Sequence, residues 1–310
     1  MKNPSRRNFL KMVGVGGAAL ATGAVCGSAD AAEGLKIDND NVAMLYDATR
    51  CVGCKACMTI CKRVNLDSGS LAYEQAEFDP DGLWDAPADL SGDTRTLIKL
   101  HKESPAKWSY VKHSCMHCQK PSCVSVCPVS AMIRDPQSGI VTYDKGICIG
   151  CRYCQIACAF NIPRFQWDKA LPQIVKCDMC KSTELPRTGT TGCASVCPAA
   201  AIHFGKRGDL LVEAQRRLDA QPEKYIQYIY GAQELGGLNH LTIAGLPFEK
   251  LGLPIVGDQP PAEFSEKIQH TIYKGFIAPV ALYGSLCYVA IRNMKKAERQ
   301  NGADEKGGDA

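Results

Sequence analysis

Sixteen of the eighteen cysteines in this chain fall into four short motifs, which constrain the fold more than any other sequence feature. The first and third motifs have the spacing C-x2-C-x2-C-x3-C, the second C-x2-C-x4-C-x3-C and the fourth C-x2-C-x12-C-x3-C. Runs of this kind supply the four thiolates that bind a [4Fe–4S] cluster. The sequence therefore predicts an electron-transfer protein with four [4Fe–4S] clusters. Their predicted ligands are Cys51, Cys54, Cys57 and Cys61; Cys115, Cys118, Cys123 and Cys127; Cys148, Cys151, Cys154 and Cys158; and Cys177, Cys180, Cys193 and Cys197.

Two other uses of so many cysteines compete with this interpretation. A disulfide framework is common in exported chains, but disulfides favour no such regular spacing. A zinc site takes two pairs of ligands and rarely a third cysteine one turn further on. The repeated spacing therefore favours iron–sulfur clusters over both. No C-x-x-C-H run occurs, which excludes covalent c-type haem.

The N-terminal segment has the pattern of an export signal. Residues 5–11 read SRRNFLK, a twin-arginine motif, and a Gly/Ala-rich apolar stretch and small residues before Ala31 follow. We expect a signal peptide over 1–31, a linker over 32–44 and a periplasmic location. The twin-arginine pathway carries folded proteins, so clusters can form in the reducing cytoplasm first. The net charge of +4 lies mostly in this signal, which gives no reason to expect nucleic-acid binding.

The cysteine motifs lie in a predicted core over 45–208, with an insertion over 62–114. Segments of this core resemble bacterial ferredoxin, which implies an α+β fold of two tandem ferredoxin-like modules. A turn sequence, residues 135–139, separates two short predicted strands. The predicted strands are 96–101, 108–112, 131–134, 140–143 and 200–204. Apolar residues at helical spacing predict a helix over 209–218.

The C-terminal part is predicted to reach a partner and the membrane. Residues 209–269 are assigned to the helix and an extended docking arm. Residues 275–291 carry no charge, and basic residues follow from Arg292 onward, so we expect one transmembrane helix over 270–292 and a cytoplasmic tail over 293–310. His270 and Tyr273 would then lie at the outer membrane edge, where interfacial anchoring is favoured over a role in quinone protonation.

Several stretches carry a resemblance to a known family: residues 46–54 (YDATRCVGC), 115–118, 123–131, 150–154 (GCRYC) and 268–275. The chain resembles the four-cluster ferredoxin subunits of complex iron–sulfur molybdoenzymes, and most of all the membrane-anchored ferredoxin subunit of hydrogenase-2-type nickel–iron hydrogenases. The family pairs the first motif with the fourth and the second with the third. The implied ligand sets are Cys51, Cys54, Cys57 and Cys197; Cys61, Cys177, Cys180 and Cys193; Cys115, Cys118, Cys123 and Cys158; and Cys127, Cys148, Cys151 and Cys154.

The resemblance also implies the partners: the small and large hydrogenase subunits and an integral membrane quinone-reactive subunit. The alternative is the beta subunit of a molybdenum or tungsten oxidoreductase, such as formate dehydrogenase or a sulfur-compound reductase. A more remote alternative is a redox sensor or a zinc-scaffold protein. No catalytic constellation appears in the sequence, so we expect no catalysis by this chain alone.

Three residues inside the motifs also attract attention. His117 is expected to pack or hydrogen-bond, and Lys55 and Arg152 either tune a cluster or lie on the surface.

Overall fold

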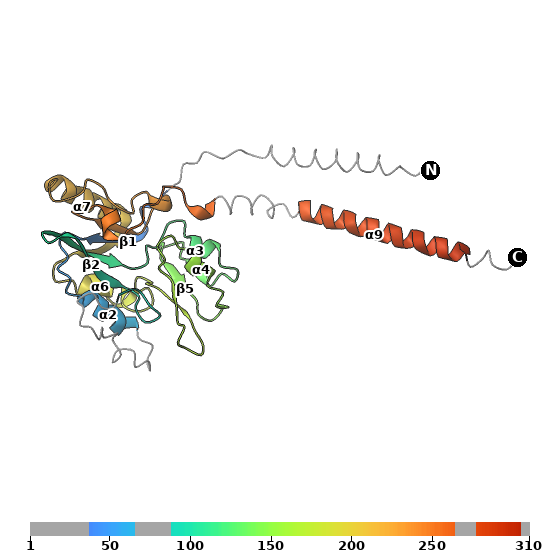
Figure 1. Ribbon diagram of the computed structural model, residues 1–310, viewed down its shortest axis with the longest axis horizontal. Coiled ribbons are helices and arrows are strands. Elements are labelled where there is room, and N and C mark those ends of the chain that lie inside the picture. The colour runs from blue at the N-terminus through green and yellow to red at the C-terminus, as the bar shows by residue number, and fades with distance from the viewer. Residues whose placement is uncertain (1–36, 66–87, 264–276, 305–310) are drawn as a thin grey trace. The chain divides into compact units, whose positions relative to one another are not determined.

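The computed structural model describes residues 37–65, 88–263 and 277–304 of the chain, and its central feature is a three-stranded sheet. Strand β1 (Val42–Asp47) is the middle strand. Strand β8 (Ile202–Lys206) pairs with it antiparallel, and β9 (His240–Ile243) pairs with it parallel. Figure 1 shows β1 beside helix α7. The sheet thus joins segments from the two ends of the core, and it brings the residues just before Cys51 next to those just after Cys197.

The two faces of β1 bury different parts of the protein, because successive side chains of a strand point to opposite sides. Ala43 and Leu45 pack against helix α7 (Arg207–Ala220), whose buried Leu210, Ala214 and Leu218 recur at helical spacing. Met44 and Tyr46 face the opposite way, into the larger apolar cluster that contains cysteines of the first and fourth motifs. The helix predicted over 209–218 is confirmed.

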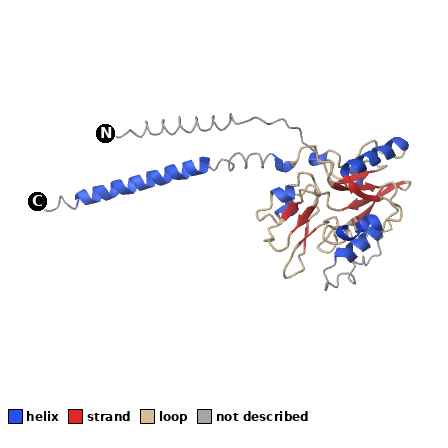
Figure 2. Cartoon of the chain, turned by 180° about the vertical axis from the view of Figure 1, so that it is seen from behind, coloured by secondary structure: helices blue, strands red, loops and turns tan. Residues whose placement is uncertain are grey.

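Three two-stranded hairpins complete the strands of the described residues (Figure 2). The predicted strands on either side of the turn at 135–139 are confirmed, as are the two in the second half of the insertion. The strand predicted over 200–204 is present as β8, shifted by two residues. The hairpins are β2 (Leu97–Ser104) with β3 (Lys107–His113), β4 (Met132–Arg134) with β5 (Val141–Tyr143), and β6 (Arg164–Phe165) with β7 (Ile174–Val175).

The helices around the cysteine motifs are short. Helix α2 packs against α6, and α3 packs against α4. They are α2 (Ala56–Asn65), α3 (Ser122–Ser125), α4 (Tyr153–Ile156), α5 (Leu185–Thr188) and α6 (Gly192–Ser195), with 3-10 turns η1 (Glu234–Gly236) and η2 (Phe248–Leu251). The described core is therefore a mixed helix and strand fold, as predicted. Its division into two tandem modules, and the domain boundaries, stay predictions.

The segment predicted to be an extended docking arm packs on the chain's own core within residues 225–263, and its docking to a partner stays a prediction. Strand β9 extends the central sheet, and Leu238, Leu241 and Ile243 have no exposed surface. An isolated bridge also pairs Leu238 with Cys118 of the second motif. The burial of these apolar side chains stabilises the segment on the core, at about 25 cal/mol per Å² removed from water.

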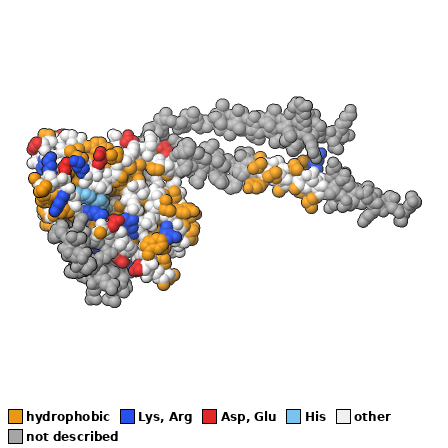
Figure 3. Space-filling model, in the orientation of Figure 1, with side chains coloured by type: hydrophobic (Ala, Val, Ile, Leu, Met, Phe, Trp, Pro, Cys, Tyr) orange, Lys and Arg blue, Asp and Glu red, His pale blue; other side chains and the backbone are white. Residues whose placement is uncertain are grey.

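The predicted transmembrane helix is also not supported. Among the described residues, no helix is both long and apolar enough to cross a membrane. Helix α9 (Ile277–Asp304) exposes apolar side chains, Val280 and Leu286 among them. Figure 3 shows hydrophobic surface along this helix. The prediction over 270–292 relied on residues 270–276, which lie outside the described residues.

Other predictions also lie outside the described residues. These are the signal peptide over 1–31, most of the linker, the acidic first half of the insertion at 66–87, the placement of His270 and Tyr273, and the end of the tail at 305–310.

Candidate iron–sulfur sites

The third cysteine of every motif occupies the same place in a local structure. Cys57, Cys123, Cys154 and Cys193 are each the second residue of a short helix, in α2, α3, α4 and α6 respectively. The fourth cysteine follows four residues later in each motif. In the first motif the helix continues past it, so Cys57 and Cys61 lie about one helical turn apart. In the other three motifs the helix ends two residues before the fourth cysteine.

The loops before these helices turn sharply through left-handed backbone conformations. Gly53 and Gly150 both have φ +70°, and Lys55 and Arg152, two residues later, have φ +57° and +63°. Glycine adopts such angles without the strain that a Cβ causes. A Cβ on Gly53 would also lie 2.3 Å from Cζ of Tyr110. The first and third motifs therefore share one loop geometry, which holds their first three cysteines around a common centre.

The structure brings the sixteen cysteines together in four sets. Three sets each line one cavity: Cys51, Cys54, Cys57 and Cys197; Cys61, Cys177, Cys180 and Cys193; and Cys127, Cys148, Cys151 and Cys154. In the fourth set, Cys115, Cys158 and Cys123 lie near enough to Cys118 for their charges to raise the pKa of its thiol, after the larger effect of burial. These are the sets implied by the family resemblance. Their ligation of iron stays a prediction.

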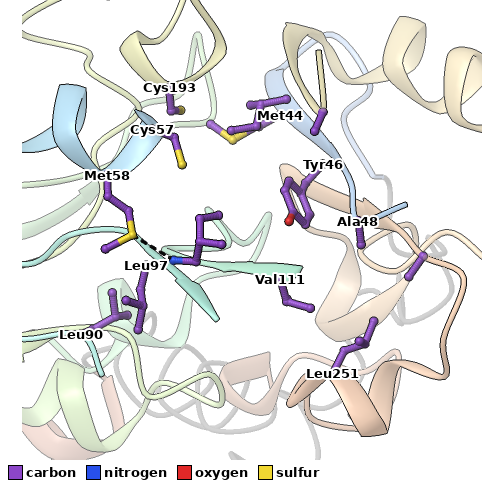
Figure 4. Close-up of a cluster of buried hydrophobic side chains, with 14 of the residues drawn as sticks. Met44, Tyr46, Ala48, Cys57, Met58, Leu90, Leu97, Val111, Cys193 and Leu251 are labelled. Carbon is purple, nitrogen blue, oxygen red and sulfur yellow. Dashed lines mark hydrogen bonds between the residues drawn. The ribbon is translucent and has the colours of Figure 1, made fainter. Parts of the chain in front are cut away.

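Neighbouring helices contribute cysteines to the same cavity. Cys57 and Cys61 of α2 line different cavities, and α6 contributes Cys193 to the cavity of Cys61. Figure 4 shows Cys57 and Cys193 near one another beside Met44, in the apolar cluster under the sheet. Within the described residues, no group of three or more His, Cys, Asp or Glu side chains is arranged to hold a single metal ion.

Burial makes the thiols poor acids in the absence of metal. It raises the pKa of Cys57, Cys123 and Cys177 to about 12 each, and that of Cys154 to about 11, with neighbouring thiolates adding to the effect. A metal must therefore displace protons from these sulfurs when it binds. Buried cysteines gathered in cavities fit a [4Fe–4S] cluster, whose iron supplies the positive charge that keeps thiolates ionised in an apolar site.

Backbone amides are aimed at several of the sulfurs. The Ala131 N–H donates to Cys127 Sγ at 3.1 Å, and the Ala201 N–H donates to Cys197 Sγ at 3.2 Å. Each donor comes four residues after its own cysteine. In both motifs, a proline directly follows that cysteine. The Gly150 N–H also donates to Cys148 Sγ at 3.4 Å. Such hydrogen bonds stabilise thiolates and tune the potential of a bound cluster.

The other residues singled out inside the motifs have structural contacts. His117 has no exposed surface, and its Nδ1 accepts a hydrogen bond from the Val141 N–H at 3.0 Å. The expected hydrogen-bonding role of His117 is therefore confirmed. The Arg152 guanidinium stacks over Trp167, 4.6 Å from the ring centroid, at the rim of the cavity lined by Cys148. For Lys55, the choice between tuning a cluster and a surface role stays open.

Sequence reasoning missed Lys112, a buried lysine that lines the cavity of Cys61 and Cys177. In the predicted strand it follows Val111, so one of the two was expected to face solvent. Both are buried. Its position three residues before Cys115 was the only available signal, and it does not distinguish a buried lysine from a surface one.

Comparisons with known proteins agree with this geometry. Residues 106–207 match the 4Fe-4S dicluster domain, and residues 3–23 match the TAT (twin-arginine translocation) pathway signal sequence. The chain is 38% identical to the "Hydrogenase-2 operon protein HybA" of Escherichia coli O157:H7, over 97% of this chain and 99% of the relative.

The chain is also similar to two further curated proteins. The chain is 30% identical to the iron–sulfur subunit of nitrate-inducible formate dehydrogenase from Escherichia coli K12, over 80% of this chain and 82% of the relative. It is 34% identical to Protein NrfC of the same organism, over 70% of this chain and 87% of the relative. With nearly complete coverage of HybA in both directions, this chain belongs to the family of hydrogenase-2 ferredoxin subunits, iron–sulfur proteins that transfer electrons within an oxidoreductase complex and are not catalytic alone.

Proposed function

We propose that this chain binds four [4Fe–4S] clusters and transfers electrons between a nickel–iron hydrogenase and a quinone-reactive membrane subunit. The observation that carries the proposal is the gathering of sixteen cysteines into four sets of four, three of them lining cavities. The twin-arginine signal supports export to the periplasm. The match to HybA over nearly its whole length supports the hydrogenase as catalytic partner.

The chain's own residues would hold and insulate the clusters. The ligand sets are Cys51, Cys54, Cys57 and Cys197; Cys61, Cys177, Cys180 and Cys193; Cys115, Cys118, Cys123 and Cys158; and Cys127, Cys148, Cys151 and Cys154. When bound, the clusters supply one-electron transfer. The packing of α2 against α6, and of α3 against α4, brings the members of each pair of sets together, and the apolar cavity walls exclude water.

The likeness to the formate dehydrogenase subunit supports a second candidate, in which a molybdenum or tungsten enzyme is the catalytic partner. The two candidates share the cluster chemistry and differ only in the metal of the co-purified large subunit. Nickel in the purified complex would support the hydrogenase, and molybdenum or tungsten the alternative.

Iron and acid-labile sulfide analysis of the anaerobically purified protein tests the cluster number. We expect about sixteen of each per chain. The variant Cys197→Ser should lose iron from the set of Cys51, Cys54 and Cys57, although these residues lie far away in sequence. Cys287→Ser is the matched control, because Cys287 is an exposed residue of α9 outside the four sets, and it should keep all its iron. Stoichiometric zinc, or an unchanged iron content in Cys197→Ser, would refute the proposal.

A further inference from the structure

Lys112 of β3 is an unusual lysine because its side chain is almost completely buried. It is 2% exposed and ranks among the largest fully buried side chains of the described residues. Its Nζ donates to Thr96 Oγ1 at 2.6 Å and to Ser114 Oγ at 3.0 Å. Both acceptors are neutral hydroxyls. Within the described part of the chain, Lys112 forms no salt bridge with a carboxylate inside 4.0 Å. A buried ammonium without an anion is costly, since each unpaired buried charge loses several kcal/mol of hydration.

The cysteines supply the site that this charge faces. Lys112 lines one cavity together with Cys61, Cys177, Cys180 and Cys193. Asp178 and Arg95 also line this cavity, and they pair with one another at 3.5 Å. Lys112 is thus a buried cation beside one cysteine set, and Cys57 of a second set lies one turn before Cys61 on α2.

Lys176 is a second buried lysine, and its Nζ donates to the backbone carbonyls of Val141 and Cys177, the latter at 2.9 Å. Lys112 differs from it in that its Nζ is held by two side-chain hydroxyls and lies at a cavity that four cysteines of one set line.

We propose that Lys112 is a positioning residue whose charge raises the reduction potential of the cluster held by Cys61, Cys177, Cys180 and Cys193, and to a smaller extent that of the cluster held with Cys57. This inference rests on the proposed function, since it requires clusters in these sets. Reduction adds one electron from the donor, dithionite in the test below, and breaks no bond, while the lysine keeps its proton. Because the reduced site carries one more negative charge, a buried cation at a fixed distance stabilises it more than the oxidised site.

The test is an anaerobic redox titration with dithionite of the purified full-length protein, followed by electron paramagnetic resonance. The variant Lys112→Met keeps the length of the side chain and removes the charge. Lys112→Arg keeps the charge. Lys107→Met is the matched control, because Lys107 lies on the same hairpin and is exposed. We expect Lys112→Met to lower the midpoint of one cluster clearly and of a second slightly, and the other two variants to titrate close to wild type.

Each outcome decides the matter. A fully loaded Lys112→Met protein with wild-type potentials would overturn the inference and leave the proposed function intact. A wild-type iron content well below sixteen would instead refute the proposed function. If Lys112→Met fails to keep its iron, the result for Lys112→Arg is decisive. Full iron content and wild-type reduction potentials in Lys112→Arg would show that the clusters need a positive charge at this position. Loss of iron in both variants would show that the shape of the lysine matters, and would overturn the inference.

Discussion

Replacing Arg217 by methionine should destabilise the core strongly, because it breaks a fully buried ion pair. Arg217 of α7 donates from Nη1 to Oδ2 of Asp47 at 3.0 Å, and the two side chains are 8% and 0% exposed. The Tyr225 hydroxyl donates to the same oxygen at 2.9 Å, and the Thr49 hydroxyl donates to Oδ1 at 2.7 Å. The pair joins α7 to the end of β1, only four residues before Cys51.

The magnitude follows from the charge left behind. Removing one partner of a buried pair typically costs about 3–5 kcal/mol, because the other charge stays buried without its counterion. A domain of this size loses roughly 2–4 °C of melting temperature per kcal/mol. The variant Arg217→Met should therefore melt about 6–20 °C below wild type. Tyr225 and Thr49 still donate to Asp47, which favours the lower half of this range.

The assay is thermal unfolding under anaerobic conditions, followed by loss of the visible iron–sulfur absorbance and by circular dichroism. Arg216→Met is the control, since Arg216 pairs with Glu213 on the exposed side of the same helix and surface pairs contribute about 0–1 kcal/mol. The double variant with Asp47→Asn should lose less than the sum of the single losses. Equal melting temperatures for Arg217→Met and Arg216→Met would refute the reasoning.

Three further predictions concern a loop, a histidine and the signal. Gly53→Ala should lower the melting temperature and iron content more than Gly189→Ala, because both have φ near +70° but only Gly53 would place a Cβ against the Tyr110 ring; equal effects would contradict this. Burial, with nearby positive charges, lowers the pKa of His240 from 6.5 to about 3, so the unfolded chain binds a proton that the folded chain does not. Stability should therefore fall as the pH drops from 6.5, by up to about 1.4 kcal/mol per pH unit, and His240→Gln should flatten this loss in urea titrations between pH 7 and 5; an unchanged slope would argue against it. Lysines in place of both arginines of residues 5–11 should leave the protein in the cytoplasm with its iron bound, as fractionation would show.

Features encoded by local spacing were predictable from the sequence. The cysteine motifs predicted the class of cofactor, and the turn at 135–139 predicted a hairpin that is present as β4 and β5. Helix α7 followed from the periodic recurrence of Leu210, Ala214 and Leu218. Each of these features depends on residues that are close together in the sequence. The local sequence pattern was therefore enough to predict the local structure.

The sequence alone was misleading where an apolar segment had more than one place to be buried. The segment from Tyr225 to Glu263 contains few helical signals, and its apolar residues suit a partner's surface as well as the chain's own sheet. In the structure, β9 of this segment pairs parallel with β1 and so joins the chain's own sheet. The uncharged stretch over 275–291 suggested a membrane helix, whereas the described residues contain no helix long and apolar enough to cross a membrane.

By itself, the sequence predicted that cysteines would bind clusters in fours, since each motif contains four cysteines at close spacing. Motif spacing left open which fourth cysteine meets which three, and the family resemblance only implied it. The tertiary structure decided it, because Cys197 meets Cys51 through the pairing of β8 with β1 across more than a hundred residues. It also decided that Lys112 faces the cysteines. Whether a strand residue is buried depends on what packs over both faces of its strand, and β3 is covered on both at that point.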